Sequence, residues 1–481
     1  MPKVRYAHKN IILLILALAQ FMVVLDTSVV NVALPSIFRG LHFHSDSSLQ
    51  WVVTAYTLAF GGFLLLGGRA ADLYGRKKIF LGGVVLFSVS SLICGLAQNS
   101  SMIEITRGVE GLAAAFMSPA ALSIVLTTFK EGKERNKAIS VWGAVAAGGA
   151  ATGVLLGGIL TQYLGWRWNF FVNIPVGLFV ILATVFYVPE STADLDHSEL
   201  DLPGAVLVTV GLMLMVYGLT KAPTYGWTSI KSLEFLGSSV VLIALFIANE
   251  ARVKHPLMPL SIFKIRNIAA ANLMQLPITA SLFSMFFFIT LYIQNVLGYS
   301  PVRSGFSFLP VTIMVGIVAI IMSGFISKVG YKIPLIIAPP FLMFALWFLV
   351  HVRVGGTYFH DVFPGLAVMA IGLGMVFIAI TIAATNGVPH KESGLASGLL
   401  NTSQQIGGSL GLAILSGVAS SATAKYLVTH SQTLHNAAEA QVVGFHHAFW
   451  VGVGFAFLAW IIAIFFIHQK KGEKIETASA A

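Results

Sequence analysis

The feature that most constrains this chain is the recurrence of long apolar runs from one end of its 481 residues to the other. A helix of about 20 apolar residues crosses a hydrocarbon layer about 30 Å thick. By that length rule about fourteen membrane spans can be placed, with ends defined to within several residues. They lie at residues 11–34, 50–68, 78–96, 103–128, 138–162, 169–188, 203–220, 233–250, 268–294, 305–327, 334–352, 362–386, 398–422 and 446–467.

The composition requires lipid as the main solvent of this chain. Charged residues make up only 10% of it and hydrophobic residues 57%, whereas a water-soluble protein carries about 25% charged residues. The start, MPKVRYAHKN followed by IILLILALAQF, superficially resembles a signal peptide, but its apolar run continues past any plausible cleavage site. We therefore interpret it as the first span. A single cysteine, Cys94, excludes internal disulfides and a cysteine-based metal site.

The distribution of basic residues predicts the orientation. An even number of spans puts both termini on one side, and that side carries 20 of the 29 Lys and Arg residues, against 7 on the other. The richer side is cytoplasmic by the positive-inside rule, so we expect both termini in the cytoplasm. The net charge of +10 therefore reflects topology, and nucleic-acid binding is not expected. The acidic segment 188–204 lies on the same side and is interpreted as a solvated linker.

Two similar loops indicate an internal repeat. The sequence GRAADLYGRKK occupies residues 68–78 and GFISKVGYKIP occupies residues 324–334. Each falls between the second and third spans of a six-span block if residues 203–250 form an inserted pair. Related six-helix halves are typical of transporters that rock around a central site. We predict an all-α membrane protein with a six-helix bundle at residues 1–190, a linker and two inserted helices at 191–267, and a second six-helix bundle with a cytoplasmic tail at 268–481.

Several stretches together resemble one family along nearly the whole chain. They are LDTSVVNVALP, GRAADLYGRKK, RGVEGLAAA, GAATGVLLGG, WRWNFFVNIPVG, YIQNVLGYSPVRSGFSFLP and SGLASGLLNTSQQIGGSLG. They are similar to motifs of the fourteen-span drug/proton antiporter branch of the major facilitator superfamily. The resemblance implies the major facilitator fold and proton-coupled export. The chain departs from the motifs at Glu110, where the branch usually has glutamine, and at Val154, where it usually has proline; the second departure weakens any inference about the direction of transport.

Buried charges in the first and fourth spans predict a proton-coupling site. At 1.5 Å per residue, Asp26 lies about 22 Å from the cytoplasmic boundary, and Arg107 lies about 8 Å from the outer one, so both sit at similar depth. Glu110 is one helical turn from Arg107. With one cation between two acids, one acid can hold a proton. We expect Asp26 to be the principal proton carrier, Arg107 its modulator and Glu110 a weaker candidate; the alternative is a structural ion pair.

The loop after the second span and the fifth span carry candidate gating residues. We expect the loop to latch the two halves together during the conformational change, although its basic residues also serve topology; its residues are Gly68, Asp72, Gly75, Arg76 and Lys77. Small residues let helices approach closely and slide. Among the glycines of the fifth span, the candidates for this role are Gly149, Gly153, Gly157 and Gly158.

Polar residues within the spans are candidates for a substrate cavity. Thr27 and Asn31 share a helix face, where they line the cavity or bond to a neighbouring helix. Uncharged amides must find partners within hydrocarbon, which favours Gln275, Gln294, Asn401, Gln404 and Gln405. Phe286 belongs to an aromatic stripe that offers a surface for cations or, alternatively, faces lipid and neighbouring helices.

The remaining motifs exclude other classes of protein. The chain has no GxxxxGK[ST] phosphate loop and no nucleophile constellation, so neither ATP-driven transport nor an enzyme is expected. No metal or cofactor is expected beyond protons as the coupling ion, and the histidines are interpreted as solvated loop residues. We predict a monomeric transporter in a bacterial cell membrane that exports hydrophobic or cationic drugs or toxic small molecules by alternating access. The alternatives are an exporter or flippase of a lipid or self-made metabolite, or a non-transporting membrane receptor.

Overall fold

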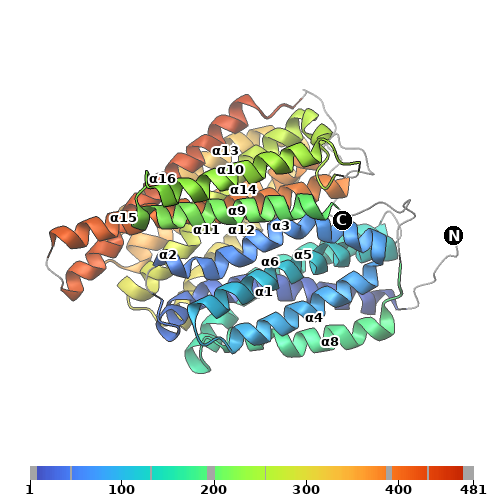
Figure 1. Ribbon diagram of the computed structural model, residues 1–481, viewed down its shortest axis with the longest axis horizontal. Helices are drawn as coiled ribbons and strands as arrows, with labels where there is room; N and C mark the ends of the chain where they lie inside the picture. The colour runs from blue at the N-terminus through green and yellow to red at the C-terminus, as the bar shows by residue number, and fades with distance from the viewer. Residues whose placement is uncertain are drawn as a thin grey trace.

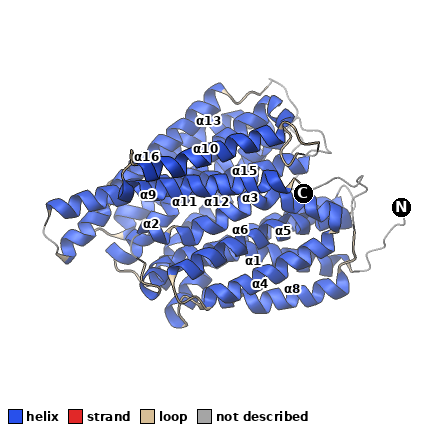
Figure 2. Ribbon diagram, viewed as in Figure 1, coloured by secondary structure: helices blue, strands red, loops and turns tan. Residues whose placement is uncertain are grey.

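The computed structural model describes residues 8–43, 46–129, 133–191, 201–254, 256–385, 393–430 and 433–469. Within these residues the chain is helical, with short loops and no strand (Figure 2). The longer helices are α1 (Lys9–Gly40), α3 (Trp51–Tyr74), α4 (Arg76–Gly95), α5 (Ser100–Thr128), α6 (Lys133–Tyr163), α8 (Asn173–Tyr187), α9 (Leu202–Tyr225), α10 (Ile230–Glu250), α11 (Arg266–Leu291), α12 (Pro301–Val329), α13 (Lys332–Leu349), α14 (Phe363–Thr385), α15 (Ser393–Thr429) and α16 (Leu434–Phe465). The short ones are α2 (Asp46–Leu49), α7 (Trp168–Phe171), the 3-10 helix η1 (Leu260–Lys264) and the π-helices η2 (Tyr292–Val296) and η3 (Tyr358–Val362).

Among the described residues, 13 segments are long and apolar enough to cross a membrane. The glycine-rich α6 is a further helix of 31 residues, which runs unbroken through Val154. Each predicted span coincides with one of these helices, so the predicted fourteen-helix architecture is confirmed.

The helix ends differ from the predicted span ends. Helix α1 continues past Pro35 to Gly40, and α15 and α16 reach 37 and 32 residues. Figure 1 shows these two helices extending beyond the rest of the bundle as an orange-red hairpin. The length rule marks only the part of a helix that needs an apolar surface, whereas the helical hydrogen-bond pattern continues beyond it.

The inserted pair α9 and α10 packs along both halves of the molecule. Figure 1 shows both helices, in green, in front of the other spans. Helix α9 contacts α10, α3 of the first half and α15 of the second. Gln50 Nε2 donates to Thr220 Oγ1 at 2.5 Å, and Leu58, Val216 and Ala413 belong to one buried apolar cluster. The exact boundaries of the predicted domains stay a prediction.

In the part of the chain that the structure describes, the two halves meet along two seams. At the predicted outer end, Gln294 Nε2 donates to the Val32 carbonyl at 2.8 Å, and the Val302 N–H donates to Gln162 Oε1 at 3.2 Å. Along the other seam, α3 packs on α15, with 2.5 Å between the hydroxyl oxygens of Thr57 and Ser409. Helix α1 also contacts α11 and α12. Helix α1 therefore belongs to the first half and reaches the second.

Candidate functional site

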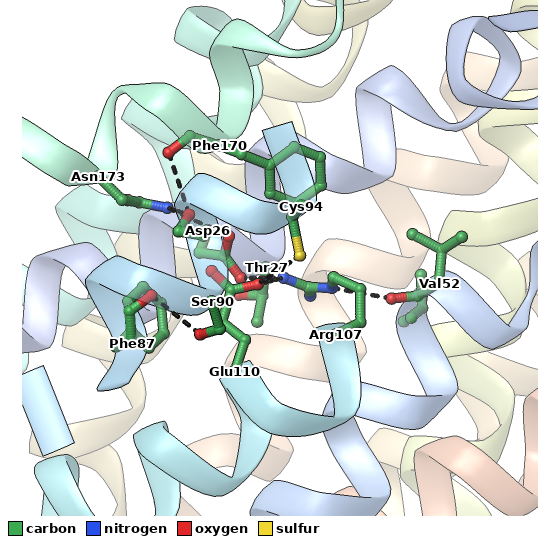
Figure 3. A network of polar contacts seen from close by, with 12 residues as sticks. Asp26, Thr27, Val52, Phe87, Ser90, Cys94, Arg107, Glu110, Phe170 and Asn173 are labelled. Carbon is green, nitrogen blue, oxygen red and sulfur yellow. Dashed lines mark hydrogen bonds and ion pairs between the residues drawn. The ribbon is translucent and has the colours of Figure 1, made fainter. Parts of the chain in front are cut away.

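Helices α1 and α5 bring Asp26, Arg107 and Glu110 together inside the first half (Figure 3). We call these three residues the charge cluster. Arg107 Nη1 donates to Asp26 Oδ2 at 2.5 Å and to Glu110 Oε2 at 2.7 Å. The side chains are 0%, 1% and 0% exposed. One guanidinium therefore bridges two acids in an environment without solvent contact.

Helix α3 holds the guanidinium of Arg107 from the other side. Arg107 Nε donates to the Val52 carbonyl at 2.9 Å, and the guanidinium carbon lies 4.4 Å from the centre of the Tyr56 ring. It also lies 5.8 Å from the Phe170 ring. Cation–π contacts are strongest where water is excluded. At Gly111 a side chain would overlap the backbone of Tyr56, so this glycine lets α3 approach Arg107 closely.

Helices α4 and α8 complete the surroundings of Asp26. Asn173 Nδ2 donates to Asp26 Oδ1 at 3.3 Å and to Ser91 Oγ at 3.0 Å, and Ser91 Oγ donates to the Phe170 carbonyl at 3.0 Å. Asn173, Ser91 and Tyr56 were not among the predicted site residues. The one available signal was the position of Asn173 within WRWNFFVNIPVG.

The charge cluster carries one more acid than base. With both carboxylates ionised its net charge is −1, and one bound proton makes it neutral, the form that costs less to bury. Cys94 Sγ donates to Glu110 Oε2 at 3.6 Å, and the described hydrogen-bond and ring partners of the cluster all belong to the first half. The arrangement can hold or release one proton, and the described contacts place no cargo surface against Asp26.

The candidate gating loop makes its described contacts within the first half. Asp72 Oδ1 accepts from Arg76 Nε at 3.1 Å and from Arg76 Nη2 at 2.9 Å. The N–H groups of Lys77 and Lys78 donate to Glu190 Oε1 and Oε2 at 3.0 and 3.2 Å. These bonds of Asp72, Arg76 and Lys77 stay within the first half, and the latch to the second half stays a prediction.

Two glycines of this loop differ in their surroundings. Gly75 has φ +108°, and a side chain there would meet the Glu190 carboxylate at 2.8 Å. Its positive φ and its lack of a side chain are both needed where α3 turns into α4. At Gly68 a side chain would stand 3.6 Å from Pro119, an ordinary contact distance.

The four candidate glycines of α6 face two different helices. At Gly149, Gly153 and Gly157 an added side chain would press on α1, against Val24, Ser28 and Val29 respectively, whereas at Gly158 it would press on Pro301 and Val302 of α12. Helix α6 therefore packs closely both within its own half and across to the second half.

Four of the predicted cavity residues contact their own helix or a helix of the other half. Thr27 Oγ1 donates to the Val24 carbonyl at 2.9 Å and Asn31 Nδ2 to the Thr27 carbonyl at 3.1 Å, so both bond to their own helix. Both are half-buried. In the second half, Gln294 bonds to α1, and Gln405 packs against Gly61 of α3.

Of the remaining cavity candidates, Phe286 packs against the apolar core and three amide residues line a pocket. Phe286 packs against Phe308, with 5.5 Å between ring centres. Gln275, Asn401 and Gln404 line one pocket between α11, α14 and α15. Within the described residues no group of three or more His, Cys, Asp and Glu is placed to hold a metal ion.

Long apolar helices that enclose a charge cluster, in two halves that meet at seams, define a multi-pass membrane transporter. A profile described as the Major Facilitator Superfamily matches residues 16–412, and the chain therefore belongs to that superfamily. The puromycin resistance protein of Streptomyces alboniger is 36% identical over 472 residues, covering 98% of this chain and 93% of that protein. The cephamycin export protein of Amycolatopsis lactamdurans is 36% identical over 408 residues, 84% of each chain.

A solved structure supports the fold. The crystal structure of a bacterial homolog of the human lysosomal transporter Spinster has a TM-score of 0.66 and 16% identity, and the match covers 96% of this chain and 98% of that one. Family and fold together confirm the predicted major facilitator architecture, a non-enzymatic transporter, and a multi-pass protein of a bacterial cell membrane.

Proposed function

We propose that this transporter exports hydrophobic, drug-like small molecules in exchange for protons and works as a monomer in membrane lipid. The buried charge cluster carries the proposal, because a surplus acid enclosed with one arginine can bind and release a single proton. The relatives named for puromycin resistance and cephamycin export support the drug-like cargo. Protons are the only coupling ion proposed, and no cofactor is involved.

The proton acts through helix packing. Asp26 of α1 is bonded to Arg107 of α5 and to Asn173 of α8. A proton on Asp26 removes its charge and weakens the attraction to Arg107, so α1 is held less firmly against α5. Because α1 also bonds to the second half through Val32, a shift of α1 reaches the seam between the halves. Release of the proton restores the original contacts.

The Asp26→Asn variant tests the proton role. Purified wild type and variant are compared in proteoliposomes with labelled cationic, neutral and lipid compounds, with and without an imposed pH gradient. Asp361→Asn is the matched control, because Asp361 pairs with the exposed Arg353 outside the charge cluster. We expect the pH gradient to stimulate transport by wild type and by the control. The stimulation of Asp26→Asn should be at least about tenfold smaller, which corresponds to a loss of roughly 1.4 kcal/mol of coupling free energy between the proton and the cargo.

The outcomes separate the proposal from its alternatives. Unchanged pH-gradient dependence in Asp26→Asn contradicts the proton role, and lower stability with unchanged dependence assigns the pair a purely structural function. Transport restricted to lipids indicates a flippase. Absence of counterflow with every compound indicates a receptor.

A further inference from the structure

The chain that follows α8 folds back onto the loop between α3 and α4, at the predicted cytoplasmic end of the first half. The Glu190 carboxylate accepts from the Lys77 and Lys78 N–H groups at 3.0 and 3.2 Å. The Ser191 carbonyl accepts from the Arg76 N–H at 2.9 Å. The first N–H groups of a helix have no partner within the helix, and a carboxylate beside them is favoured by the helix dipole. We call these contacts the first clamp.

The second half repeats this arrangement with the chain that follows α16. Gln469 Oε1 accepts from the Lys332 N–H at 3.0 Å, at the start of α13. The carbonyl of His468, one residue earlier, accepts from Tyr331 Oη at 3.0 Å and from Asn267 Nδ2 at 2.7 Å. We call these contacts the second clamp. Each clamp therefore joins the loop after the second span of its half to the chain after the sixth span.

The two clamps also agree in their local geometry. In each half, an N–H that the clamp binds lies two residues after a glycine with positive φ. At Gly75, with φ +108°, an added side chain would meet the Glu190 carboxylate, and at Gly330, with φ +88°, it would overlap the Gln469 amide. Glycine adopts a positive φ at little cost and leaves this space open. The glycines that the two similar loops have in common therefore make room for matching contacts.

Each clamp lies at the end of a helix that forms a seam between the halves. Helix α3, which ends at Tyr74, packs on α15 of the second half, and α12, which ends at Val329, packs on α6 of the first half. We call α3 and α12 the seam helices. Beyond each clamp, α4 packs along α8 and α13 packs along α16. The clamps therefore attach the cytoplasmic end of each seam helix to a helix pair of its own half.

A seam helix contacts both halves, so it needs a fixed attachment to the half with which it moves. We propose that Glu190 and Gln469 are equivalent positioning residues, which hold α3 and α12 to their own halves while the halves rock. Transporters built from two related halves change access largely by rigid-body rocking of one half against the other. A seam helix that does not move with its half would alter the balance between the two arrangements. The clamps act on the conformational change itself, whatever the coupling ion or the cargo.

Energy transfer between two dyes measures this motion. The dyes are attached to cysteines introduced at Thr127 and Lys328, which are exposed near the cytoplasmic ends of α5 and α12. The native Cys94 is buried and stays unlabelled. Single molecules of the full chain in lipid nanodiscs are compared for wild type, Glu190→Ala and Gln469→Ala. Thermal unfolding of each variant is measured in parallel.

Further variants separate the hydrogen bond from the identity of the side chain. Glu190→Gln and Gln469→Glu each keep an oxygen that accepts from the helix N–H groups, and the double variant exchanges the two residues between the halves. Glu234→Ala and Gln441→Ala are the matched controls outside the clamps. Glu234 is exposed near the start of α10, and Gln441 lies about 36 Å before the end of α16.

We expect each alanine variant to change the ratio of short to long dye distances at least about fivefold, the lower end of typical coupling between parts of a protein. The exchange variants and the controls should match wild type. A lower unfolding temperature with an unchanged ratio would assign the clamps a purely structural role and overturn the proposal. An effect of only one alanine variant would also overturn it.

The double exchange variant keeps the test decisive if an alanine variant does not fold. It retains an acceptor in both clamps, so a ratio unlike that of wild type would show that the two residues are not equivalent. The dye distances are measured without cargo and without a pH gradient. A failure of proton-coupled export therefore leaves this result unchanged, and unaltered dye distances leave the proposed export function standing.

Discussion

Replacement of Arg107 by methionine should destabilise the first half more than loss of either acid. The substitution replaces the unbranched stem of the side chain but removes the guanidinium, which leaves two buried carboxylates, at Asp26 and Glu110, without their shared cation. Loss of one partner of a buried ion pair costs about 3–5 kcal/mol, because the remaining charge is uncompensated. A domain of 150–250 residues loses about 2–4 °C of melting temperature per kcal/mol, so Tm should fall by about 6–20 °C.

The assay is thermal unfolding of the purified protein in detergent, repeated for Arg107→Met alone and for the triple variant Asp26→Asn, Arg107→Met, Glu110→Gln. Because the triple variant leaves no unpaired charge in the cluster, and a neutral amide costs far less to bury than a carboxylate, it should recover most of the lost stability. The loss in Arg107→Met should shrink at low pH, since a neutral carboxylic acid is cheaper to bury than a carboxylate. A triple variant as unstable as Arg107→Met, or a single variant that loses less than about 1 kcal/mol, would refute the reasoning that the cluster is held by charge.

Three further substitutions test the packing around the site. Gly157→Leu should separate α1 from α6 and slow transport at least about tenfold in the proteoliposome assay, while Gly148→Leu, where an added side chain meets nothing within 4 Å, serves as its control. Gly75→Ala should lower the free energy of unfolding by about 1–3 kcal/mol, because of its φ of +108° and the nearby Glu190; an unchanged Tm would contradict this. Asn173→Leu should cost about 1–3 kcal/mol by the same measurement, since it removes a donor from the buried acid of α1, and a Tm equal to that of wild type would show that this hydrogen bond contributes nothing.

The helices could be predicted from the sequence because the requirement they meet is simple. A lipid-crossing segment must be apolar and of a fixed minimum length, and both properties can be counted. The same constant rise per residue placed Asp26 and Arg107 at one depth, and in the structure they are bonded. The ends of α15 and α16 could not be predicted in this way, since outside the membrane a helix no longer needs an apolar surface.

Which side chains contact the charged residues depends on how each helix is rotated about its own axis, and apolar composition does not determine that rotation. Tyr56 and Asn173 reach Arg107 and Asp26 because α3 and α8 are rotated so that these side chains point inward. In a membrane helix most faces are apolar, so hydropathy leaves that rotation undetermined. The same reason explains why Gln275 lines a pocket whereas Gln294 bonds to α1, although both are amides of one apolar segment.

The charge cluster lies in the first half, whereas Gln275, Asn401 and Gln404 line a pocket in the second, and this separation bears on how such a chain can evolve. Substitutions among Gln275, Asn401 and Gln404 would change the lining of that pocket without touching any described bond of Arg107. Distant sites of this kind usually respond to mutation independently. Side chains that line the pocket of the second half can therefore change one at a time, while the described bonds of the charge cluster are inherited intact.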